Sequence, residues 1–585
     1  MSKNIVSQSI FYLKKIFSAN QKKLALILLF IMIFGMVFEI LLLNNLMLLL
    51  NYLTNSNIKT PETILVLMNY FNVSNPTTLA LLIFIITFFL KTLTTIIVRW
   101  KESKFIHTIK AEISEQLYTG YLRLPFIFHQ RTNSAKILKN ITLEIEQFAI
   151  FIFASSKFLL ELLVLIGIST YLMFIDPYIS LACVFAFVAF GYIFNLFNRG
   201  KIHSMSVSRL FHQDERIKAI MEGLAGMREI KLLSREENKI KNFVDHNNQI
   251  AKISISIALR NAFSKPSFEI FMLILLSGFL FYFISRDLLN ASLIPIIGIY
   301  LAAAYRLVPS ISTIVQAIQE IQFNLRSVKN LYDDIEKFNA NKLNNTDNKS
   351  KILFQDKIEI KNLSFSYENE DDKKRKDILN NISLEIKKGD FVGIQGESGS
   401  GKSTFIDVLI GLHSLKEGSI LVDGNNINEG VKSWQSLIGC VPQEVFIMDD
   451  TLKKNIAFGL NEEKISDQDV EKSLKFSNLK NFSQTLEKGA NTLIGEKGSR
   501  LSGGQKQRIG IARAIYNNPE ILIFDESTNS LDIETESKIV EEINLLRKDK
   551  TLIIVSHNKN VFRKCDYVLK LTDKKIVKIQ NKEYF

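Results

Sequence analysis

Six long apolar stretches constrain the fold of this chain more than any other feature of its sequence. They cover residues 24–50, 78–100, 148–174, 178–197, 267–285 and 291–316. A bilayer core of about 30 Å is crossed by roughly 20 apolar residues in a helix, so each stretch is long enough to span a membrane. Six spans put both ends of the chain on one side. We therefore expect an all-α membrane domain of six helices.

The basic residues predict which side that is. Lys and Arg are frequent in 101–147 and 198–264, whereas 51–77 holds one lysine and Phe174–Ser180 holds no basic residue. Basic loops stay on the cytoplasmic side, so we expect both termini to be cytoplasmic. Membrane topology accounts for the net charge of +13, and no nucleic-acid partner is expected. The N-terminus lacks a signal-peptide cleavage pattern and suits a helix on the inner membrane surface.

Three further patterns describe the segments between and after the spans. Both basic segments have helical periodicity, so we expect the membrane helices to continue into the cytoplasm. Outside, Pro61–Phe71 suits a helix on the outer membrane surface, with a disordered loop as the alternative. The asparagine-rich Phe338–Lys351 is typical of a flexible connector. We predict a membrane domain at 1–335, a linker at 336–355 and a soluble domain at 356–585.

The soluble part carries a phosphate-binding motif. Gly396–Ser403, GESGSGKS, matches G-x-x-x-x-G-K-[ST], follows a strand-like run and precedes a helical pattern, which is the context that the motif requires. Backbone N–H groups of such a loop surround the phosphates, Lys402 can reach the β and γ oxygens, and the Ser403 hydroxyl can bind Mg²⁺. The predicted nucleotide contacts in this segment are Gly396, Glu397, Ser398, Gly399, Ser400, Gly401, Lys402, Ser403 and Thr404. ATP and Mg²⁺ are the expected cofactors.

Two carboxylates follow a second apolar strand pattern. Asp525 is placed to bind Mg²⁺, and Glu526 to orient or deprotonate a water. Two acids at the end of a strand can also be ordinary turn chemistry. Leu501–Arg508, LSGGQKQR, adds a glycine-containing turn before a helix whose N-terminus can hold an anion. Together these motifs favour an α/β P-loop NTPase domain.

In this order the motifs resemble those of the ATP-binding cassette (ABC) family, in its exporter-type form with six spans before one cassette. The resemblance implies a type I exporter membrane domain and a homodimer in which each ATP lies between Lys402 of one copy and Ser502 of the other. It implies that Tyr367 stacks on adenine, that Gln443 senses magnesium and the membrane domain, and that His557 is a switch histidine. The implied catalytic residues are Glu526, His557 and Lys402, and the implied metal site is Ser403, Gln443 and Asp525. The implied signature contacts are Ser502, Gly503, Gly504 and Gln505.

The resemblance also covers the connecting loops. Leu124–Thr142 and Met221–Glu236 resemble the two cytoplasmic loops that dock on the cassette, and the segment around Glu496 resembles a cross-talk loop. One departure is Asn529–Ser530, where the family usually has serine and alanine before the leucine and aspartate. Because Asp532 is retained, we expect altered contacts between subunits without loss of activity. Cys183, Cys440 and Cys565 lack metal spacing and are interpreted as free thiols.

Charged residues inside the apolar stretches bear on the transported substrate. With a rise of ~1.5 Å per residue, Lys91 lies about 20 Å from Thr78, and Glu39 and Arg306 lie at a comparable depth. A central charge costs about 2.5–3.5 kcal/mol, so it usually faces a partner, a ligand or a wet cavity. The simpler interpretation is an ion pair such as Glu39 with Lys91. The alternative is a site for an anionic head group, favoured by one acid against two bases, with Lys265 adding to the field.

Several of these positions resemble a flippase that carries polyprenyl-pyrophosphate-linked oligosaccharides across a bacterial inner membrane. They are Glu39, the segment 61–71, Lys91 and Tyr305–Ser310. We therefore predict an ATP-hydrolysing homodimeric exporter or flippase of the cytoplasmic membrane that moves a lipid-linked oligosaccharide or a similar anionic lipid. A peptide, lipid A-like lipid or drug is the alternative cargo. An ATP-gated channel or regulatory membrane protein is the alternative of another class.

Overall fold

The computed structural model describes most of the chain, in two units. The described residues are 5–53, 66, 68–70, 75–285, 294–344, 350–367, 376–415, 417–495, 498–526, 541 and 549–584. Contacts divide the chain into a helical unit, Met1–Leu124 with His129–Asn344, and a second unit, Pro125–Phe128 with Asn345–Phe585. Three predictions lie wholly or largely outside the described residues. They concern Pro61–Phe71, Glu496 and Asn529–Asp532.

The helical unit is built from a few very long helices and several short ones. Its elements are α1 Ile5–Ile16, α2 Ala19–Leu53, α4 Pro76–Leu122, α6 Ser134–Lys139, the π-helix η1 Asn140–Glu144, α7 Ile145–Ile175, α8 Pro177–Ala225, α9 Met227–Leu232, α10 Glu236–Ser285 and α11 Ile294–Asn344. The short helix α5, Phe126–Arg131, connects α4 to α6. Helices α4, α8 and α10 continue far beyond the apolar stretches within them.

Five helical segments among the described residues are long and apolar enough to cross a membrane. They are Ala19–Leu53, Pro76–Leu122, Ser134–Ile175, Pro177–Ala225 and Gly298–Asn341. These segments contain the first four predicted spans and most of the sixth. The fifth predicted span, 267–285, forms the end of α10. The chain is thus a multi-pass membrane protein.

Local sequence sets where two of these helices begin. Asn75 Oδ1 accepts a hydrogen bond from the Thr77 amide at 3.1 Å, and Pro76 occupies the first turn of α4. Asp176 Oδ1 accepts from the amides of Tyr178 and Ile179 at 3.0 and 3.1 Å, ahead of α8 with Pro177 in its first turn. Both starts follow the preference for a side-chain acceptor at the N-cap and proline directly after it.

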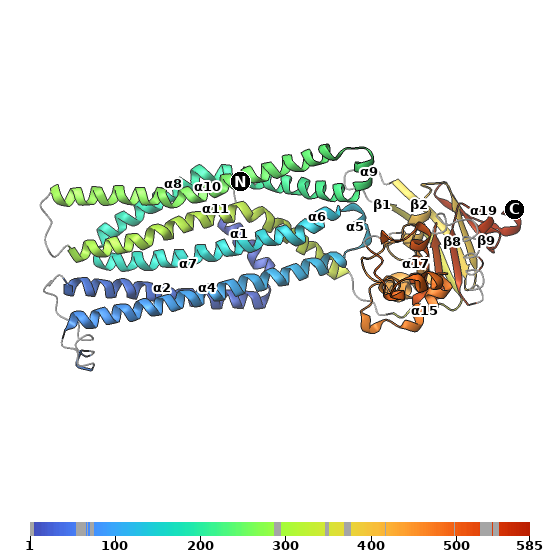
Figure 1. The fold of residues 1–585 in the computed structure, drawn as a ribbon, viewed down its shortest axis with the longest axis horizontal. Helices are drawn as coiled ribbons and strands as arrows, with labels where there is room; N and C mark the ends of the chain where they lie inside the picture. Colours follow the sequence, from blue (N-terminus) through green and yellow to red (C-terminus); the bar gives the residue numbers. More distant parts are fainter. Residues whose placement is uncertain are drawn as a thin grey trace. The chain divides into compact units, whose positions relative to one another are not determined.

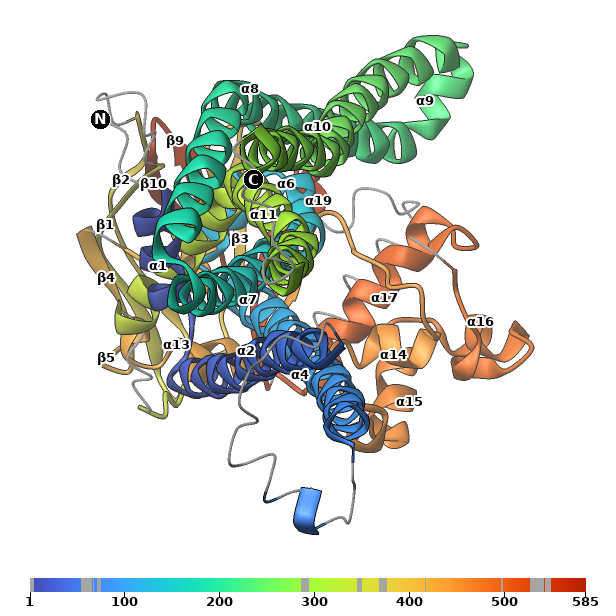
Figure 2. The ribbon, with the colours of Figure 1, turned by 90° about the vertical axis from the view of Figure 1, so that its left-hand side faces the viewer.

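The long helices pair along their lengths. Figures 1 and 2 show α2 beside α4, α8 beside α10, and α7 beside α11. A buried cluster that includes Leu43, Ile168, Phe268 and Leu307 joins α2, α7, α10 and α11. The interior of the helical unit is therefore apolar, and a charge placed in it needs a partner.

The second unit is an α/β domain with two sheets. Its strands are β1 Lys357–Tyr367, β2 Lys376–Lys387, β3 Phe391–Gly396, β4 Glu417–Val422, β5 Asn425–Asn426, β6 Ile438–Val441, β7 Ile521–Asp525, β8 Thr551–Val555, β9 Tyr567–Thr572 and β10 Lys575–Gln580. An antiparallel sheet has the order β2-β1-β4-β5, and a mainly parallel sheet has the order β10-β9-β3-β8-β7-β6. Strands β3, β7 and β8 are almost fully buried, as expected for parallel strands covered on both faces.

Short helices surround the two sheets. They are α12 Lys402–Leu409, η3 Ile427–Glu429, α13 Val431–Ser436, α14 Leu452–Ile456, η4 Glu462–Lys464, α15 Asp467–Phe476, α16 Lys480–Thr485, η5 Gly489–Asn491, α17 Gly503–Tyr516, α19 Lys559–Phe562 and α20 Asn581–Tyr584. One buried cluster joins the two sheets with α12. Because β3 and β7 end at the same edge of the parallel sheet, the loops after them meet there.

Candidate functional site

The phosphate-binding loop connects β3 to α12. Gly401, the residue before α12, has φ +105°, and a Cβ there would lie 2.9 Å from the Ile378 side chain, so glycine suits both the backbone and the space. The buried Lys402 ammonium donates to the carbonyl oxygens of Gly396 and Glu397 at 3.0 and 3.1 Å. It can thus exchange these neutral acceptors for phosphate oxygens without leaving the loop.

Three predicted residues converge on Glu526. Lys402 Nζ lies 3.6 Å and His557 Nε2 lies 2.9 Å from Glu526 Oε1, and Gln443 Nε2 donates to Oε2 at 3.1 Å. Glu526 has φ +49°, a left-handed conformation that a side chain other than glycine, asparagine or aspartate seldom adopts. Such strain persists where the surrounding structure holds it, and it is common at functional sites.

The acid at the end of β7 fits a magnesium ligand. The Asp525 carboxylate is hydrogen-bonded to Ser403, and its Oδ1 is buried with no hydrogen-bond partner among the described residues. Burial raises the pKa of Asp525, with a further rise from Glu526, while the Ser403 hydrogen bond opposes the change. A hydroxyl and a carboxylate are oxygen ligands of the kind that Mg²⁺ prefers, and a divalent ion would compensate the buried carboxylate.

Tyr367 and the signature residues lie in separate parts of the second unit. Tyr367, at the end of β1, places its hydroxyl 3.4 Å from Thr404 Oγ1, next to the phosphate-binding loop. Ser502 caps α17: its Oγ accepts from the Gln505 amide at 3.3 Å, and Gln505 Oε1 accepts from the Ser502 amide at 2.8 Å. Within the part of the chain that the structure describes, the Ser502 side chain bonds to Gln505 and to no residue of the phosphate-binding loop.

The remaining predicted residues belong to the phosphate-binding loop and to the start of α17. Glu397, Ser398 and Gly399 form the exposed part of the loop, and the Ser400 hydroxyl is buried without a partner among the described residues. Gly503 and Gly504 form the first turn of α17, and a Cβ at Gly503 would meet no atom within 4 Å. The backbone at that helix start is therefore open to a ligand.

Close to Asp525, one of the predicted magnesium ligands, lies a titratable group that sequence reasoning missed. Asp407, on α12, has its pKa raised from 3.8 to about 6, first by burial and then by the charge of Asp525. Burial, with Asp525 and Asp407, also raises the pKa of the Cys440 thiol on β6 to about 12. In the sequence, Asp407 stands on the helix that starts at Lys402, which is the only indication that it lies near the site. Helical spacing alone does not reveal that its side chain is buried against β7.

Asp407 gives a pH-dependent prediction. Between pH about 4 and about 6 the folded state holds a proton on Asp407 that the unfolded state has lost, so the free energy of unfolding falls as pH rises through this window. Asp407→Asn removes the titrating group. It should therefore raise the free energy of unfolding by roughly 2–3 kcal/mol at about pH 7.5, and by about a third of that at about pH 4.5. Unfolding of the full chain is followed by Trp434 fluorescence in a Trp100→Phe background. As a control, Asp549→Asn alters an exposed carboxylate and should leave the free energy of unfolding unchanged at both pH values. Equal stabilisation by Asp407→Asn at both pH values would contradict the raised pKa of Asp407.

In the helical unit, three of the four predicted substrate residues meet in one cluster. Lys91 Nζ lies 3.2 Å from Glu39 Oε2, and Arg306 bonds to Glu39 through its Nε. Arg306 also pairs with Glu161 Oε2 at 3.3 Å, and Ser310 donates to the same oxygen at 2.7 Å. The cluster joins α2, α4, α7 and α11. The expected ion pair between Glu39 and Lys91 is therefore present.

The predicted positive excess of this cluster is wrong. Glu161, which lies within the third apolar stretch, pairs with Arg306, so that two acids balance the two bases. Lys265 is not part of the cluster, because it pairs with Glu269 one turn along α10 at 3.7 Å, and both side chains are exposed. The sequence contained Glu161, but its pairing with Arg306 depends on how α7 lies against α11.

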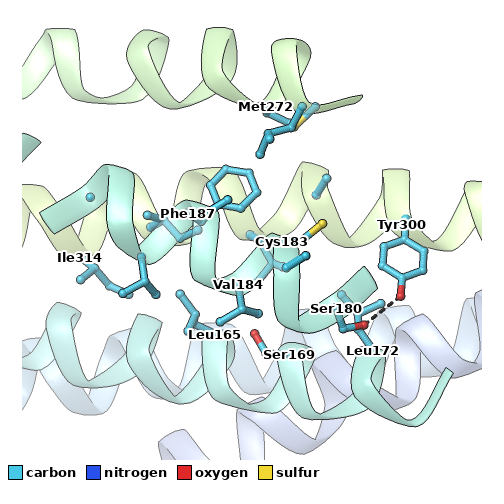
Figure 3. A pocket seen from close by; sticks show the side chains of 18 of the residues that line it. Leu165, Ser169, Leu172, Ser180, Cys183, Val184, Phe187, Met272, Tyr300 and Ile314 are labelled. Carbon is cyan, nitrogen blue, oxygen red and sulfur yellow. Dashed lines mark hydrogen bonds between the residues drawn. The ribbon is translucent and has the colours of Figure 1, made fainter. Parts of the chain in front are cut away.

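The helical unit also holds an apolar pocket of about 880 Å³, lined by residues of α7, α8, α10 and α11. Figure 3 shows Leu165 and Leu172 of α7, Val184 and Phe187 of α8 and Met272 of α10 around it. A polar pair lies among the apolar side chains, with the Ser180 and Tyr300 hydroxyls 2.8 Å apart. Leu162 and Leu307, which line the pocket, directly follow Glu161 and Arg306 in sequence, so pocket and cluster share one level of α7 and α11. The pocket is large enough for a lipid-like or drug-sized molecule.

Comparison with known proteins agrees with both units. The family model described as "ABC transporter transmembrane region" matches residues 24–301, and the one described as "ABC transporter" matches residues 379–529. An export ATP-binding/permease protein of Rickettsia typhi is 30% identical over 491 residues, which are 81% of this chain and 82% of that protein. A multidrug export ATP-binding/permease protein of Bacillus subtilis is 26% identical, covering 82% of this chain and 81% of that protein.

A solved structure shares the fold over nearly the whole chain. It is a bacterial Atm1-family ABC exporter with ATP bound, with a TM-score of 0.72 and 19% identity, covering 94% of this chain and 95% of that one. At this identity the likeness speaks for the fold alone. Together with the matched families and the phosphate-binding geometry, it leads to one conclusion: this chain belongs to the ABC transporters, as an export ATPase with a membrane domain fused to its ATP-binding cassette.

Proposed function

We propose that this exporter acts as a homodimer in a bacterial cytoplasmic membrane and moves an anionic lipid, of the lipid-linked oligosaccharide class, from the inner to the outer leaflet. One observation carries the choice of substrate. In the charged cluster the acids are buried, with side-chain exposures of 6% for Glu39 and 10% for Glu161, whereas Lys91 and Arg306 are 28% and 30% exposed. The accessible surface of the cluster is therefore mostly basic.

An anionic group would reach these bases from their exposed side. A phosphate could then bind to Lys91 or Arg306 from that side while the buried carboxylates keep their contacts to the same bases. The apolar pocket at the same level supports a substrate with a hydrocarbon chain, because burial of each CH₂ group stabilises binding by about 0.8 kcal/mol. An anionic head and an apolar tail together describe a lipid.

For ATP hydrolysis we assign a role to each residue around Glu526. The Glu526 carboxylate would orient and deprotonate the attacking water, His557 would hold the γ-phosphate, and Lys402 would neutralise charge on the β and γ oxygens. Ser403, Gln443 and Asp525 would hold Mg²⁺, whose charge polarises the phosphate oxygens. Tyr367 would stack on adenine beside Thr404.

The homodimer is supported by the separation of Ser502 from the phosphate-binding loop. A second copy could bring its own α17, with Gly503 and Gly504 at an open helix start, to the ATP held by Lys402. Two copies would give two complete sites. We also propose the division into a membrane domain at 1–335, a linker at 336–355 and an ATP-binding domain at 356–585, with both termini cytoplasmic. The first part of this linker, up to Asn344, continues α11 as helix, so that only the rest of it can serve as a flexible connector.

The substrate proposal predicts the behaviour of Lys91→Ala. Loss of one phosphate contact should slow ATP-driven movement of a fluorescent polyprenyl-pyrophosphate-linked saccharide in proteoliposomes by about tenfold, the equivalent of ~1.4 kcal/mol. Basal ATPase activity should stay within about twofold, because Lys91 is remote in sequence from every residue of the ATP site. Lipid movement is measured by quenching of the fluorophore in the outer leaflet.

Lys157→Ala is the matched control. Lys157 also lies in an apolar stretch, but its ammonium rests 4.3 Å from the Phe153 ring centre and makes no ion pair among the residues that the structure describes. It should leave lipid movement unchanged. The substrate proposal is overturned if Lys91→Ala and Lys157→Ala have equal effects on lipid movement. It is also overturned if the unaltered protein moves only peptides, zwitterionic lipids or drug-like dyes.

A further inference from the structure

The loop between α4 and α7 is closed at its base by a buried hydrogen-bond network. Tyr121 lies just before residues 122–139 of this loop, and Asn140 lies just after them. Asn140 Nδ2 donates to the Tyr121 hydroxyl at 2.9 Å, and both donate to Asp334 Oδ2 of α11, at 2.8 Å from Asn140 and 2.6 Å from Tyr121. Tyr121, Asn140 and Asp334 are only 3%, 4% and 8% exposed. We call these three residues the clamp.

Tight packing surrounds the clamp. A Cβ at Gly120 would lie 2.4 Å from the Phe338 ring, so α4 and α11 approach one another as closely as they do only because residue 120 is glycine. The Tyr121 and Phe338 rings meet edge to face at 5.0 Å between centroids. Asn341 Nδ2 donates to the Arg123 carbonyl at 3.1 Å, and His129 Nε2 lies 3.0 Å from the Tyr121 carbonyl. Both ends of the loop are therefore held to one short section of α11.

The second end of the loop also has unusual helix geometry. Asn140 begins the π-helix η1, whose wider turn continues to Glu144 before α7 starts. Single π-helical turns interrupt α-helices mainly at functional positions. Here the wider turn begins at Asn140, whose side-chain amide bonds to Tyr121 of α4 and to Asp334 of α11.

Between the clamp residues, the loop carries Pro125–Phe128, which group with the ATP-binding unit. The Phe126 ring lies 5.9 Å from the His413 ring, which stacks on Phe365. The helix that holds the other side of the clamp, α11, runs on to Asn344, where the chain passes to the ATP-binding unit. The clamp thus joins the two chain segments through which a movement of that unit can reach α4, α7 and α11.

We propose that Tyr121, Asn140 and Asp334 are positioning residues that transmit nucleotide-driven movement of the ATP-binding domain to the membrane helices. With the clamp intact, the loop and α11 move as one body, so displacement of Phe126 is passed to α4 and α7. Without it, the loop bends at its base and the movement is absorbed there. The proposal depends on the ATP-driven export activity of the family and is independent of the substrate proposed above.

Tyr121→Phe tests the proposal, because it removes one hydroxyl and keeps the ring against Phe338. The full chain in lipid nanodiscs is compared with and without ATP and vanadate by hydrogen–deuterium exchange. We expect the nucleotide-dependent change in exchange to persist in the ATP-binding domain and to fall at least fivefold in α7 and α11. Basal ATPase activity should stay within about twofold, because the three clamp residues belong to the helical unit and the residues assigned to the ATP site belong to the other unit.

Tyr332→Phe is the matched control, since Tyr332 also donates to a carboxylate of α11, Glu336, at 3.1 Å, but on the exposed side. Tyr332→Phe should keep the full nucleotide-dependent change in exchange in α7 and α11. Asp334→Asn retains an acceptor for the Tyr121 hydroxyl. It should therefore keep more of the nucleotide-dependent change in exchange than Asp334→Ala does. The proposal is overturned if α7 and α11 respond equally in Tyr121→Phe and Tyr332→Phe. It is also overturned if the ATP-binding domain loses its own response in Tyr121→Phe, or if the membrane helices of the unaltered protein do not respond.

Discussion

Glu526→Gln should reduce steady ATP hydrolysis by about 10²–10³-fold while leaving ATP binding within a few-fold of the unaltered protein. The amide keeps the size of the side chain and its contact distances to Gln443 and His557, but it has no basic oxygen to accept a proton from water. The neighbouring Lys402 would still meet the phosphates. Hydrolysis is measured as phosphate release, and binding as retention of labelled ATP on the protein.

Glu520→Gln is the control for this experiment. Glu520 directly precedes β7, but its carboxylate pairs with Lys388 at 2.7 Å, away from Glu526. It should hydrolyse ATP at the rate of the unaltered protein. Undiminished hydrolysis in Glu526→Gln would mean that another group activates the water, and a loss of binding as large as the loss of hydrolysis would make Glu526 a binding residue only.

Arg306→Leu should lower the free energy of unfolding of the membrane domain by about 3–5 kcal/mol. Arg306 is the shared partner of Glu39 and Glu161, and its removal leaves a buried carboxylate without a compensating charge. The double variant with Glu161→Gln should recover most of this loss, because Glu161 is then neutral and Glu39 keeps Lys91 as its partner. Unfolding is followed by titration with sodium dodecyl sulfate in mixed micelles.

Arg260→Leu separates this charge effect from the loss of an arginine as such. Arg260 donates to a neutral partner, Asn198 Oδ1, at 2.6 Å, so its removal should cost only about 1–2 kcal/mol. If Arg306→Leu cost no more than this control, or if the double variant were no more stable than the single one, the cluster would not behave as a network of buried charges.

The nucleotide site was predictable to a large extent because its parts are encoded over short distances. The loop before Lys402 and the two acids after β7 each combine an apolar run with residues that have a strong local preference. Their meeting point follows from a general property of parallel sheets, in which strand ends share one edge. The capping pair of Ser502 and Gln505 is also local, since the serine and glutamine stand three residues apart and bond reciprocally.

The membrane cluster shows where sequence reasoning went wrong. Glu39, Lys91 and Arg306 were recognised because each interrupts an apolar run, and the ion pair of Glu39 with Lys91 was among the alternatives. Glu161 interrupts a run in the same way, but its consequence depends on its partner. Without the packing of α7 on α11, the charge balance was counted as positive when the acids and bases are equal in number.

By itself the sequence determined the first four spans and most of the sixth, the two kinds of domain and the phosphate-binding motif, since hydropathy, helix starts and phosphate loops depend on neighbouring residues. The tertiary structure decided which distant groups share a partner. Arg306 with Glu161, Asp407 behind Asp525, and Tyr121 with Asn140 and Asp334 join residues of different helices or of a helix and a strand. Burial makes each of these pairings matter, because a polar group without water requires a partner, and only packing brings that partner within reach.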